Sequence, residues 1–488
     1  MRDWFPALVA IRGEERRYGW DTWSVLTDPE WTVIRSLKRE LKDAGPRTEL
    51  DVGGHSVRIT DLLRGLAQAL RRNLLEASTL RVKPGDEMEV MLGVPANANS
   101  NQRFLTTEAF RAAGFRVIGL LNEPSAASVE FAHVDRAPTK RGLLVYDLGG
   151  GTFDASLVMT EGGLHTVLAT AGIPTLGGDD FDEILAGLAL EAAGDADELT
   201  PAEVFRLLDE CREKKESLNP NTRKLVIDLD RVRAGWGEVT VAAADFYEHC
   251  RPLIEQTRET VDQLIGACGA QSIDTLYVTG GGAELPAVAR VLKEHFGRKV
   301  RRSAYMRSAT AIGLAISGDP RSGYRVKDRL THHFGVWREA NVGREVAFDL
   351  LVPGGTVLPG PSDPPYRITR SYHPAHNVGH FRYVECSQLG ETGQPSGDIT
   401  VWEDVRFPFD PSLFSVDDLA EVPVIRADRE HEQYVTEEYA CDASGRIQVR
   451  IANVTAGYSR EYHLGNWTVP RSRTTRKARS PIARRRQS

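Results

Sequence analysis

Cysteine is scarce in this sequence, and the five cysteines present follow no recognisable pattern. They are Cys211, Cys250, Cys268, Cys386 and Cys441, an odd number with no CxxC spacing. This distribution argues against a disulfide framework and against a zinc site. The sequence therefore gives no sign of an oxidising compartment, and we expect a cytoplasmic protein.

Long apolar segments are absent as well. No run of 18 apolar residues occurs, so we expect no membrane-spanning helix and no membrane partner. The apolar stretch from Trp4 to Ile11 is short, and charged residues follow it at once. It lacks the form of a secretory signal peptide.

Acidic residues outnumber basic residues over most of the chain, but not at its end. The formal net charge is −7, and Arg471 to Ser488 holds eight Lys or Arg and no acid, which leaves −15 for the remainder. The composition of residues 471–488 predicts a basic, disordered tail. Either this tail is solvated without a partner, or it meets anionic partners; a role in nucleic-acid binding would be weak and confined to it.

Short apolar runs alternate with amphipathic stretches in the first two thirds of the chain. With 488 residues, roughly two to four domains are expected. Met88–Val94, Val117–Leu121 and Leu143–Tyr146 are predicted strands, and Gln102–Ala113 is a predicted helix. Alternation of this kind predicts an α/β fold with ligands at the strand ends.

The pattern changes near Gly318, where the stretch GDPRSGY indicates a linker over residues 318–328. From 329 to 470, short segments separated by Gly, Pro, Asn or Asp predict a β-rich, sandwich-like domain. The clearest predicted strands are Arg344–Val352, Gly379–Cys386, Asp398–Val405 and Arg446–Val454.

The strongest functional signal is the string LVYDLGGGTFDASL, in which a buried strand ends at Asp147 and Gly149–Gly151 follow. Consecutive glycines let several backbone N–H groups point at one anion. Asp147 and Asp154 flank the turn, and carboxylates beside a phosphate site require a divalent cation or an ordered water between them. The string predicts a phosphate-binding hairpin with a metal.

Two further glycine turns follow. In LYVTGGGAELP, Gly280–Gly282 come after a predicted strand and before a predicted helix near Pro286, which lets a phosphate approach the backbone near a positive helix end. Gly177–Gly178 precede a helix with an acidic first turn, which alone is compatible with simple capping. Together the three turns predict a nucleotide held between two α/β lobes.

These motifs resemble the ATPase domain of the Hsp70 chaperone family. The strings LVYDLGGGTFDASL, VLATAGIPTLGGDDFDE, VPANANSNQR, LLNEPSAAS and TGGGAELP occur in the family's order and span about Thr32 to Ser317. The resemblance implies an α/β, two-lobed, actin-like (ribonuclease H-like) ATPase domain over residues 1–317, followed by the β-rich domain. It also implies ATP or ADP with Mg²⁺ as cofactors, unfolded or partly folded proteins as clients, and co-chaperones as partners.

The resemblance also assigns roles to individual residues. Asp147 would hold Mg²⁺ through water, Glu123 and Asp154 would orient the attacking water, and Lys38 would reach the γ-phosphate. From the residues alone, Lys38 could equally be a solvated helix charge. The expected nucleotide-binding residues are Gly149, Gly150, Gly151, Thr152, Gly177, Gly178, Lys215, Gly280, Gly281 and Gly282.

The sequence departs from the family at its front end. Family members begin with a phosphate loop of the form DLGT, and this chain starts at about the point that follows it. We expect either a misplaced start codon or the loss of half the phosphate clamp together with a central strand. The loss of a charged phosphate contact is costly at the transition state, so ATP hydrolysis by this chain is in doubt.

Other departures lie at the adenosine end and in the linker. Glu284 stands where an arginine usually stacks on adenine, and Arg307 stands where an acid is usual. Tyr324 to Asp328 is too polar for the apolar linker that docks on the ATPase domain in chaperones. These differences predict weaker base contacts and no docked linker.

Two alternatives remain open. A non-hydrolysing pseudo-ATPase scaffold is suggested by the missing front loop and by Glu284 and Arg307. An actin-like filament protein or a sugar kinase would share the fold, but the strings NEPSAA and GGDDFDE argue against both.

Overall fold

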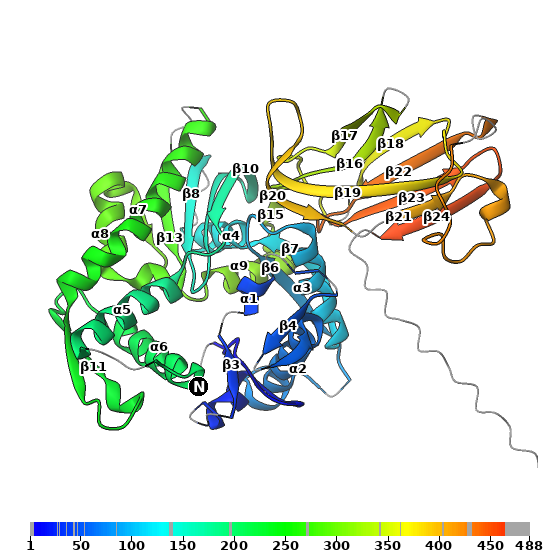
Figure 1. Ribbon diagram of the computed structural model, residues 1–488. Helices are drawn as coiled ribbons and strands as arrows, with labels where there is room; N and C mark the ends of the chain where they lie inside the picture. Colours follow the sequence, from blue (N-terminus) through cyan, green and yellow to red (C-terminus); the bar gives the residue numbers. More distant parts are fainter. Residues whose placement is uncertain are drawn as a thin grey trace, which may run out of the picture.

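The computed structural model describes residues 4–463, except for 27, 29, 36, 42–43, 46, 53, 84, 136–139, 195–197, 270–272, 341–342, 362, 403–404 and 427–431. The predicted basic tail 471–488 lies outside the described residues. The chain forms a first α/β lobe, a second α/β lobe and a β-rich part (Figure 1).

The first lobe is built on three small sheets and the helices that cover them. Strand order is β2-β1-β3 in one sheet, while β4 pairs with β5 and β6 runs parallel to β7. Apolar residues of β1, α2 and α3 share one core, among them Ile11, Leu62 and Leu105. The elements are β1 (Val9–Arg12), β2 (Glu15–Tyr18), η1 (Gly19–Ser24), β3 (Thr32–Ile34), α1 (Leu37–Glu40), β4 (Glu49–Val52), β5 (His55–Arg58), α2 (Ile59–Ala77), β6 (Met88–Val94), α3 (Ser100–Ala112), β7 (Phe115–Asn122) and α4 (Glu123–Asp135).

The second lobe surrounds a six-stranded sheet of order β14-β13-β8-β9-β10-β15. Its central strands are parallel where β13 meets β8 and antiparallel where β8 meets β9. Residues of β8 are buried along nearly the whole strand, because helices pack on the sheet (Figure 1). The elements are β8 (Arg141–Leu148), β9 (Phe153–Glu161), β10 (Leu164–Ile173), α5 (Gly178–Ala193), α6 (Pro201–Glu216), β11 (Lys224–Asp228), η2 (Leu229–Arg231), β12 (Glu238–Ala242), α7 (Ala243–Ala267), β13 (Thr275–Thr279), η3 (Gly281–Glu284), α8 (Pro286–Phe296), η4 (Gly297–Lys299) and β14 (Val300–Arg302).

Helix α9 (Ala309–Gly318) leaves the second lobe and packs on α4 of the first lobe. The two helices approach so closely that a Cβ atom on Gly313 would overlap the carbonyl oxygen of Ala126. A glycine is therefore required at this crossing. Among the described helices, none is both long and apolar enough to cross a membrane.

The predicted linker holds η5 (Pro320–Ser322) and β15 (Arg325–Lys327). The expectation that this polar segment would not dock was wrong, because β15 pairs in parallel with β10, and Arg325 N–H donates to the Gly163 carbonyl at 2.9 Å. Strand pairing uses backbone groups, so exposed polar side chains on an edge strand do not oppose it.

The β-rich part packs two sheets over one apolar core. Strand order is β17-β16-β19-β20, with β21 also paired to β19, in one sheet and β18-β22-β23-β24 in the other. The predicted strand Asp398–Val405 is two strands, since β20 ends at Val401 and β21 begins at Val405. The elements are β16 (His333–Ala340), β17 (Glu345–Val352), β18 (Tyr366–Tyr372), β19 (Val378–Leu389), β20 (Pro395–Val401), β21 (Val405–Pro408), η7 (Pro411–Leu413), β22 (Val435–Cys441), β23 (Ile447–Asn453) and β24 (Tyr458–His463).

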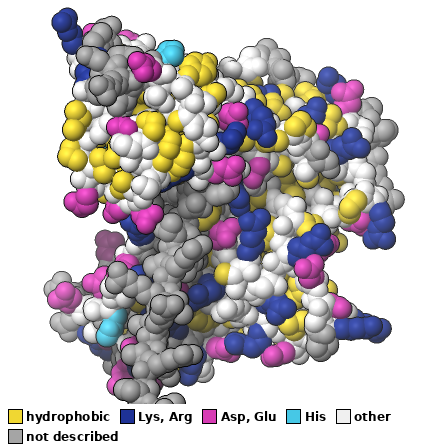
Figure 2. Space-filling model, turned by 90° about the vertical axis from the view of Figure 1, so that its right-hand side faces the viewer, with side chains coloured by type: hydrophobic (Ala, Val, Ile, Leu, Met, Phe, Trp, Pro, Cys, Tyr) yellow, Lys and Arg dark blue, Asp and Glu magenta, His cyan; other side chains and the backbone are white. Residues whose placement is uncertain are grey.

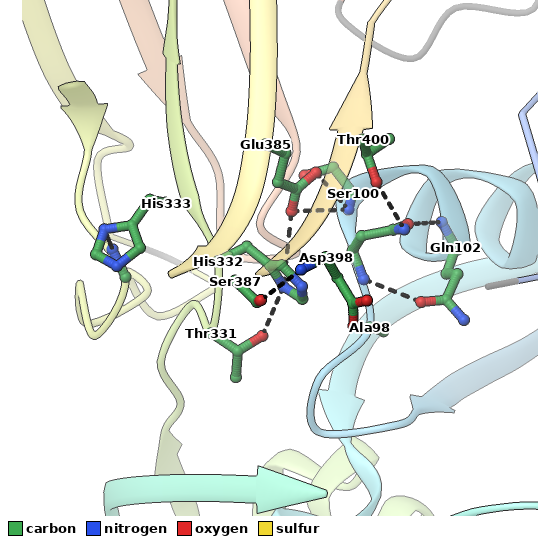
Figure 3. Close-up of polar contacts among 12 residues, drawn as sticks. Ala98, Ser100, Gln102, Thr331, His332, His333, Glu385, Ser387, Asp398 and Thr400 are labelled. Carbon is green, nitrogen blue, oxygen red and sulfur yellow. Dashed lines mark hydrogen bonds and ion pairs between the residues drawn. The ribbon is translucent and has the colours of Figure 1, made fainter. Parts of the chain in front are cut away.

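The β-rich part rests on the start of α3. Figure 3 shows Glu385 of β19 pointing at the first turn of this helix, where both carboxylate oxygens accept from the Ser100 N–H at 3.1 and 3.0 Å. In the same turn, the Asn99 side chain accepts from the Gln102 N–H at 2.9 Å and donates to the Thr400 hydroxyl at 3.3 Å. One end of α3 is thus capped from both domains.

Candidate functional site

The three glycine turns meet at one place in the second lobe. The Gly178 N–H donates to the Gly149 carbonyl at 2.9 Å, and the Asp179 N–H donates to the Gly150 carbonyl at 2.8 Å. A Cβ atom on Gly177 would overlap the backbone of Gly150. The turn before α5 is therefore packed backbone to backbone on the turn after β8.

The third turn, Gly280–Gly282, joins the same cluster from β13. Thr279 and Asp147 are register partners in parallel strands, so both strands end at the same edge of the sheet. A Cβ atom on Gly282 would lie 2.6 Å from the Gly149 carbonyl oxygen. Three backbone turns without side chains thus form a single concentrated set of peptide groups.

Gly280 is the most constrained of these glycines. Its φ angle is 90°, and a Cβ atom there would overlap the carbonyl oxygen of Leu148. We expect Gly280→Ala to lower the free energy of unfolding by about 2–4 kcal/mol, because backbone strain and overlap add. Gly162→Ala is the control, since its φ of 55° is also positive but nothing lies within 4 Å of the new methyl; we expect it to cost about 1 kcal/mol. Equal urea midpoints for the two variants would contradict the packing argument.

Three carboxylates and one ammonium group stand beside the glycine cluster. Asp147 at the end of β8 faces Asp154 of β9 in register, and both are buried. Lys38 of α1 donates to both oxygens of Glu123, at the start of α4, at 2.8 and 2.7 Å. The Asp154 carboxylate accepts from the Ala96 N–H at 2.9 Å. The four predicted catalytic residues therefore come from four different elements and meet at one site.

The electrostatics of this group favour a cation. Burial, together with the charges of Glu123 and Asp154, raises the pKa of Asp147 to about 7. Burial and the charge of Glu123 raise the pKa of Asp154 to about 6. Burial lowers the pKa of Lys38, but Glu123 and Asp154 outweigh it, so its pKa is raised. One ammonium does not neutralise three carboxylates, and a bound cation would relieve the excess.

The donor set fits a magnesium ion held through water rather than directly. Among the described residues, no group of three His, Cys, Asp or Glu is placed to coordinate a metal by itself. Mg²⁺ usually keeps several waters and takes one or two carboxylates together with phosphate oxygens. Asp147, buried next to the bare peptides of Gly149–Gly151, is suited to that arrangement.

Lys215 reaches the glycine cluster from α6. Its ammonium donates to the Gly178 carbonyl at 2.5 Å and pairs with Asp182 of α5 at 2.6 Å. Burial outweighs this pairing and raises the pKa of Asp182 to about 6. Lys215 thus ties α6 to the start of α5 at the edge of the site.

The predicted adenosine end holds an ion-pair bridge. Arg307 donates to one oxygen of Glu284 at 2.8 and 2.6 Å, and to Glu216 of α6 at 3.0 Å. The two residues that depart from the family, Glu284 and Arg307, therefore pair with each other. The sequence analysis did not foresee this pairing, although their opposite charges were a signal for it.

Two further residues at the site were missed. Arg39 of α1 contacts the carbonyl of Gly151, and the Thr310 hydroxyl of α9 lies 3.4 Å from the Asp147 carboxylate. The string SLKREL carries Lys38 and Arg39 side by side, so a second basic residue near the site could have been inferred. Thr310 offered no signal, because it lies 163 residues from Asp147.

Comparison with known proteins agrees with this geometry. The family model described as Hsp70 protein matches residues 81–332, which is just over half of the chain. The chain belongs to the Hsp70 family.

Curated Hsp70 relatives match the same part of the chain. The chaperone protein HscA of Cronobacter sakazakii (strain ATCC BAA-894) is 32% identical over 336 residues, and that of Serratia proteamaculans (strain 568) is 32% identical over 345. A heat shock protein of the fungus Pyricularia oryzae (strain 70-15 / ATCC MYA-4617 / FGSC 8958) is 29% identical over 343. Each match covers 65% of this chain and 53% of the relative. The chain therefore spans about half the length of the curated relatives it matches.

Proposed function

We propose that this Hsp70-family protein binds ATP or ADP with Mg²⁺ at the glycine cluster and uses the nucleotide to act on unfolded or partly folded proteins. The convergence of three glycine turns on Asp147 carries the proposal. In this assignment the backbone amides of Gly149–Gly151 and Thr152 bind phosphate oxygens, assisted by Gly280–Gly282. Gly177–Gly178 and Lys215 support that loop from α5 and α6.

The remaining residues orient the reacting groups. Asp147 would hold Mg²⁺ through water, and the ion would neutralise charge on the phosphates. Lys38 would move from Glu123 toward the terminal phosphate, since an anion of higher charge competes for its ammonium. Glu123 and Asp154 would then be free to orient and deprotonate a water near that phosphate.

The β-rich part supports a role with protein partners. Figure 2 shows hydrophobic side chains gathered on the upper part of one face, over this part of the molecule, with charged side chains intermixed below. Its exposed large apolar residues include Val424, Ile425, Tyr434 and Val454. Exposed apolar side chains of this kind are typical of protein-binding surfaces. Clients and co-chaperones are the partners we propose.

Calorimetric titration of the chain with ADP or ATP tests the nucleotide site. We expect binding that requires Mg²⁺ and that tightens as pH rises from about 6 to 8, because Asp147 and Asp154, with pKa values of about 7 and 6, must lose protons. The unliganded fold should change in the opposite sense: a raised carboxylate pKa stabilises the fold at low pH, and that contribution is lost as pH rises through about 7. Absence of binding at pH 8 with Mg²⁺ would overturn the proposal.

A second candidate is a scaffold that binds nucleotide without hydrolysing it. The bridge of Arg307 with Glu284 and Glu216 favours it, because these charges occupy the end of the site where a base would be recognised. Measured phosphate release separates the two candidates. Turnover that disappears in Asp147→Asn would exclude the scaffold, and tight binding without turnover would support it.

A further inference from the structure

Arg39 connects the two lobes beside the phosphate-binding turn. It belongs to α1 of the first lobe, which lies between the lobes in Figure 1. Its Nε donates to the Gly151 carbonyl at 3.0 Å, and its Nη2 pairs with the Asp180 carboxylate of α5 at 2.6 Å. Both charged side chains are about four-fifths buried, with 21% and 22% of their surface exposed. A partly desolvated ion pair therefore crosses from one lobe to the other.

The partners of Arg39 are themselves parts of the glycine cluster. The Asp180 carboxylate also accepts from the Gly177 N–H at 2.7 Å, so Arg39 is linked through Asp180 to the turn before α5. At the other end, a Cβ atom on Gly151 would lie 3.1 Å from the Arg39 Nε. Arg39 thus lies against two of the three turns at once.

The contact with Gly151 fixes the direction of one peptide group. The C=O of Gly151 and the N–H of Thr152 belong to the same planar trans peptide and point in opposite directions. Because Arg39 holds the carbonyl toward the first lobe, the Thr152 N–H is directed the other way. Thr152 is one of the residues proposed to bind phosphate, so Arg39 orients a phosphate donor without touching the phosphate.

A second arginine strengthens the same connection. Arg35, which follows β3, places its guanidinium 5.4 Å from the centre of the Phe205 ring of α6 and 3.9 Å from the Asp182 carboxylate. Strand β3 also packs on α6. The corner formed by β3 and α1 is therefore attached to both α5 and α6 of the second lobe.

We propose that Arg39 is a positioning residue that couples closure of the two lobes to the orientation of the Gly151–Thr152 peptide, and so slows the release of bound nucleotide. The inference rests on the proposed function for its release step, but the coupling itself concerns the unliganded protein. Polar, partly exposed contacts break more easily than the buried α4–α9 contact that also joins the lobes. Opening would therefore begin at Arg39.

Release of a fluorescent ADP from the Mg²⁺-loaded chain tests the proposal by stopped flow. We expect Arg39→Ala to release ADP about 10-fold faster, with the association rate nearly unchanged. Arg39→Lys should lie between, because one ammonium can keep the Asp180 pair or the Gly151 contact but lacks the geometry for both. Arg64→Ala is the control: Arg64 pairs with Asp61 on the surface of α2, and we expect no change.

Hydrogen exchange of the unliganded protein provides a second measurement. In Arg39→Ala, the amides of residues 150–153 and 178–182 should exchange faster, whereas those of α2 should not. If the variant binds ADP but neither its release nor these amides change, the role of Arg39 is wrong and the nucleotide site stands. If the unaltered chain binds no nucleotide but these amides respond, the proposed function fails while the lobe connection holds.

Discussion

Asp147→Asn should abolish most Mg²⁺-dependent nucleotide binding and, at the same time, stabilise the unliganded protein at alkaline pH. The carboxylate at the end of β8 is the group best placed to hold Mg²⁺ through water, and its loss should weaken Mg²⁺-nucleotide affinity on the order of 100-fold. An asparagine keeps the shape and an acceptor oxygen but carries no charge. The titration described above, with and without Mg²⁺, measures this effect.

The gain in stability follows from the crowding of charge at the site. Burial and the neighbouring Glu123 and Asp154 raise the pKa of Asp147 to about 7, so the ionised form destabilises the unliganded fold above that pH. Removing that charge should raise the free energy of unfolding at pH 8 by about 2 kcal/mol and leave it nearly unchanged at pH 5.

Asp61→Asn on the surface of α2 serves as the matched control, because it changes the net charge equally and breaks only an exposed pair with Arg64. We expect neither effect there. An Asp147→Asn protein that bound Mg²⁺-ADP as tightly as the unaltered chain would remove the metal from the proposed site. A loss of stability at pH 8 would contradict the electrostatic argument.

The glycine cluster could be predicted from sequence because its determinants are local. A buried strand followed by consecutive glycines defines a turn by itself, and the structure places Gly149–Gly151 there. The strand Met88–Val94 is observed with the predicted bounds, since its apolar run is bounded by charged residues and a turn. The helix predicted from Gln102 begins two residues earlier, at Ser100, because the Asn99 cap determines its start.

Contacts between distant segments could not be predicted in the same way. Arg39 and Asp180 are separated by 141 residues, and Arg307 and Glu216 by 91. In the sequence each of these residues is one charge among many, and only the packing of the lobes selects its partner. Backbone pairing is equally hidden, as the docking of the polar strand β15 on β10 shows.

The contact between the β-rich part and the first lobe was also beyond sequence analysis. Glu385 lies in β19, where the residues around it are buried, and an acid at such a position gives no indication of its partner. Near it, the Arg103 side chain is 1% exposed and donates to the Asn122 side chain at 2.5 Å and to the Ser444 carbonyl at 3.4 Å. His332 lies 4.0 Å from Glu385 (Figure 3). A buried polar network therefore joins the two domains.

Glu385→Lys should separate the β-rich part from the α/β lobes. A lysine there would place a positive charge against the N–H groups at the start of α3, where the helix dipole is positive, and close to Arg103. Because this charge would be buried without an acidic partner of its own, we expect docking to be weakened by about 3 kcal/mol or more. Small-angle scattering should show a larger radius of gyration, and limited proteolysis should cut within residues 318–328.

Glu385→Gln distinguishes the electrostatic argument from simple loss of shape. Burial raises the pKa of Glu385 to about 7, so docking of the unaltered protein is favoured below that pH and weakens as pH rises through it. Glutamine keeps an acceptor for the Ser100 N–H and cannot ionise, so its docking should not change between pH 6 and 8 and should exceed that of the unaltered protein at pH 8. If Glu385→Gln separated the domains as fully as Glu385→Lys, the carboxylate charge itself would be the attachment, and the buried acid would have to be ionised at the start of α3 at every pH tested.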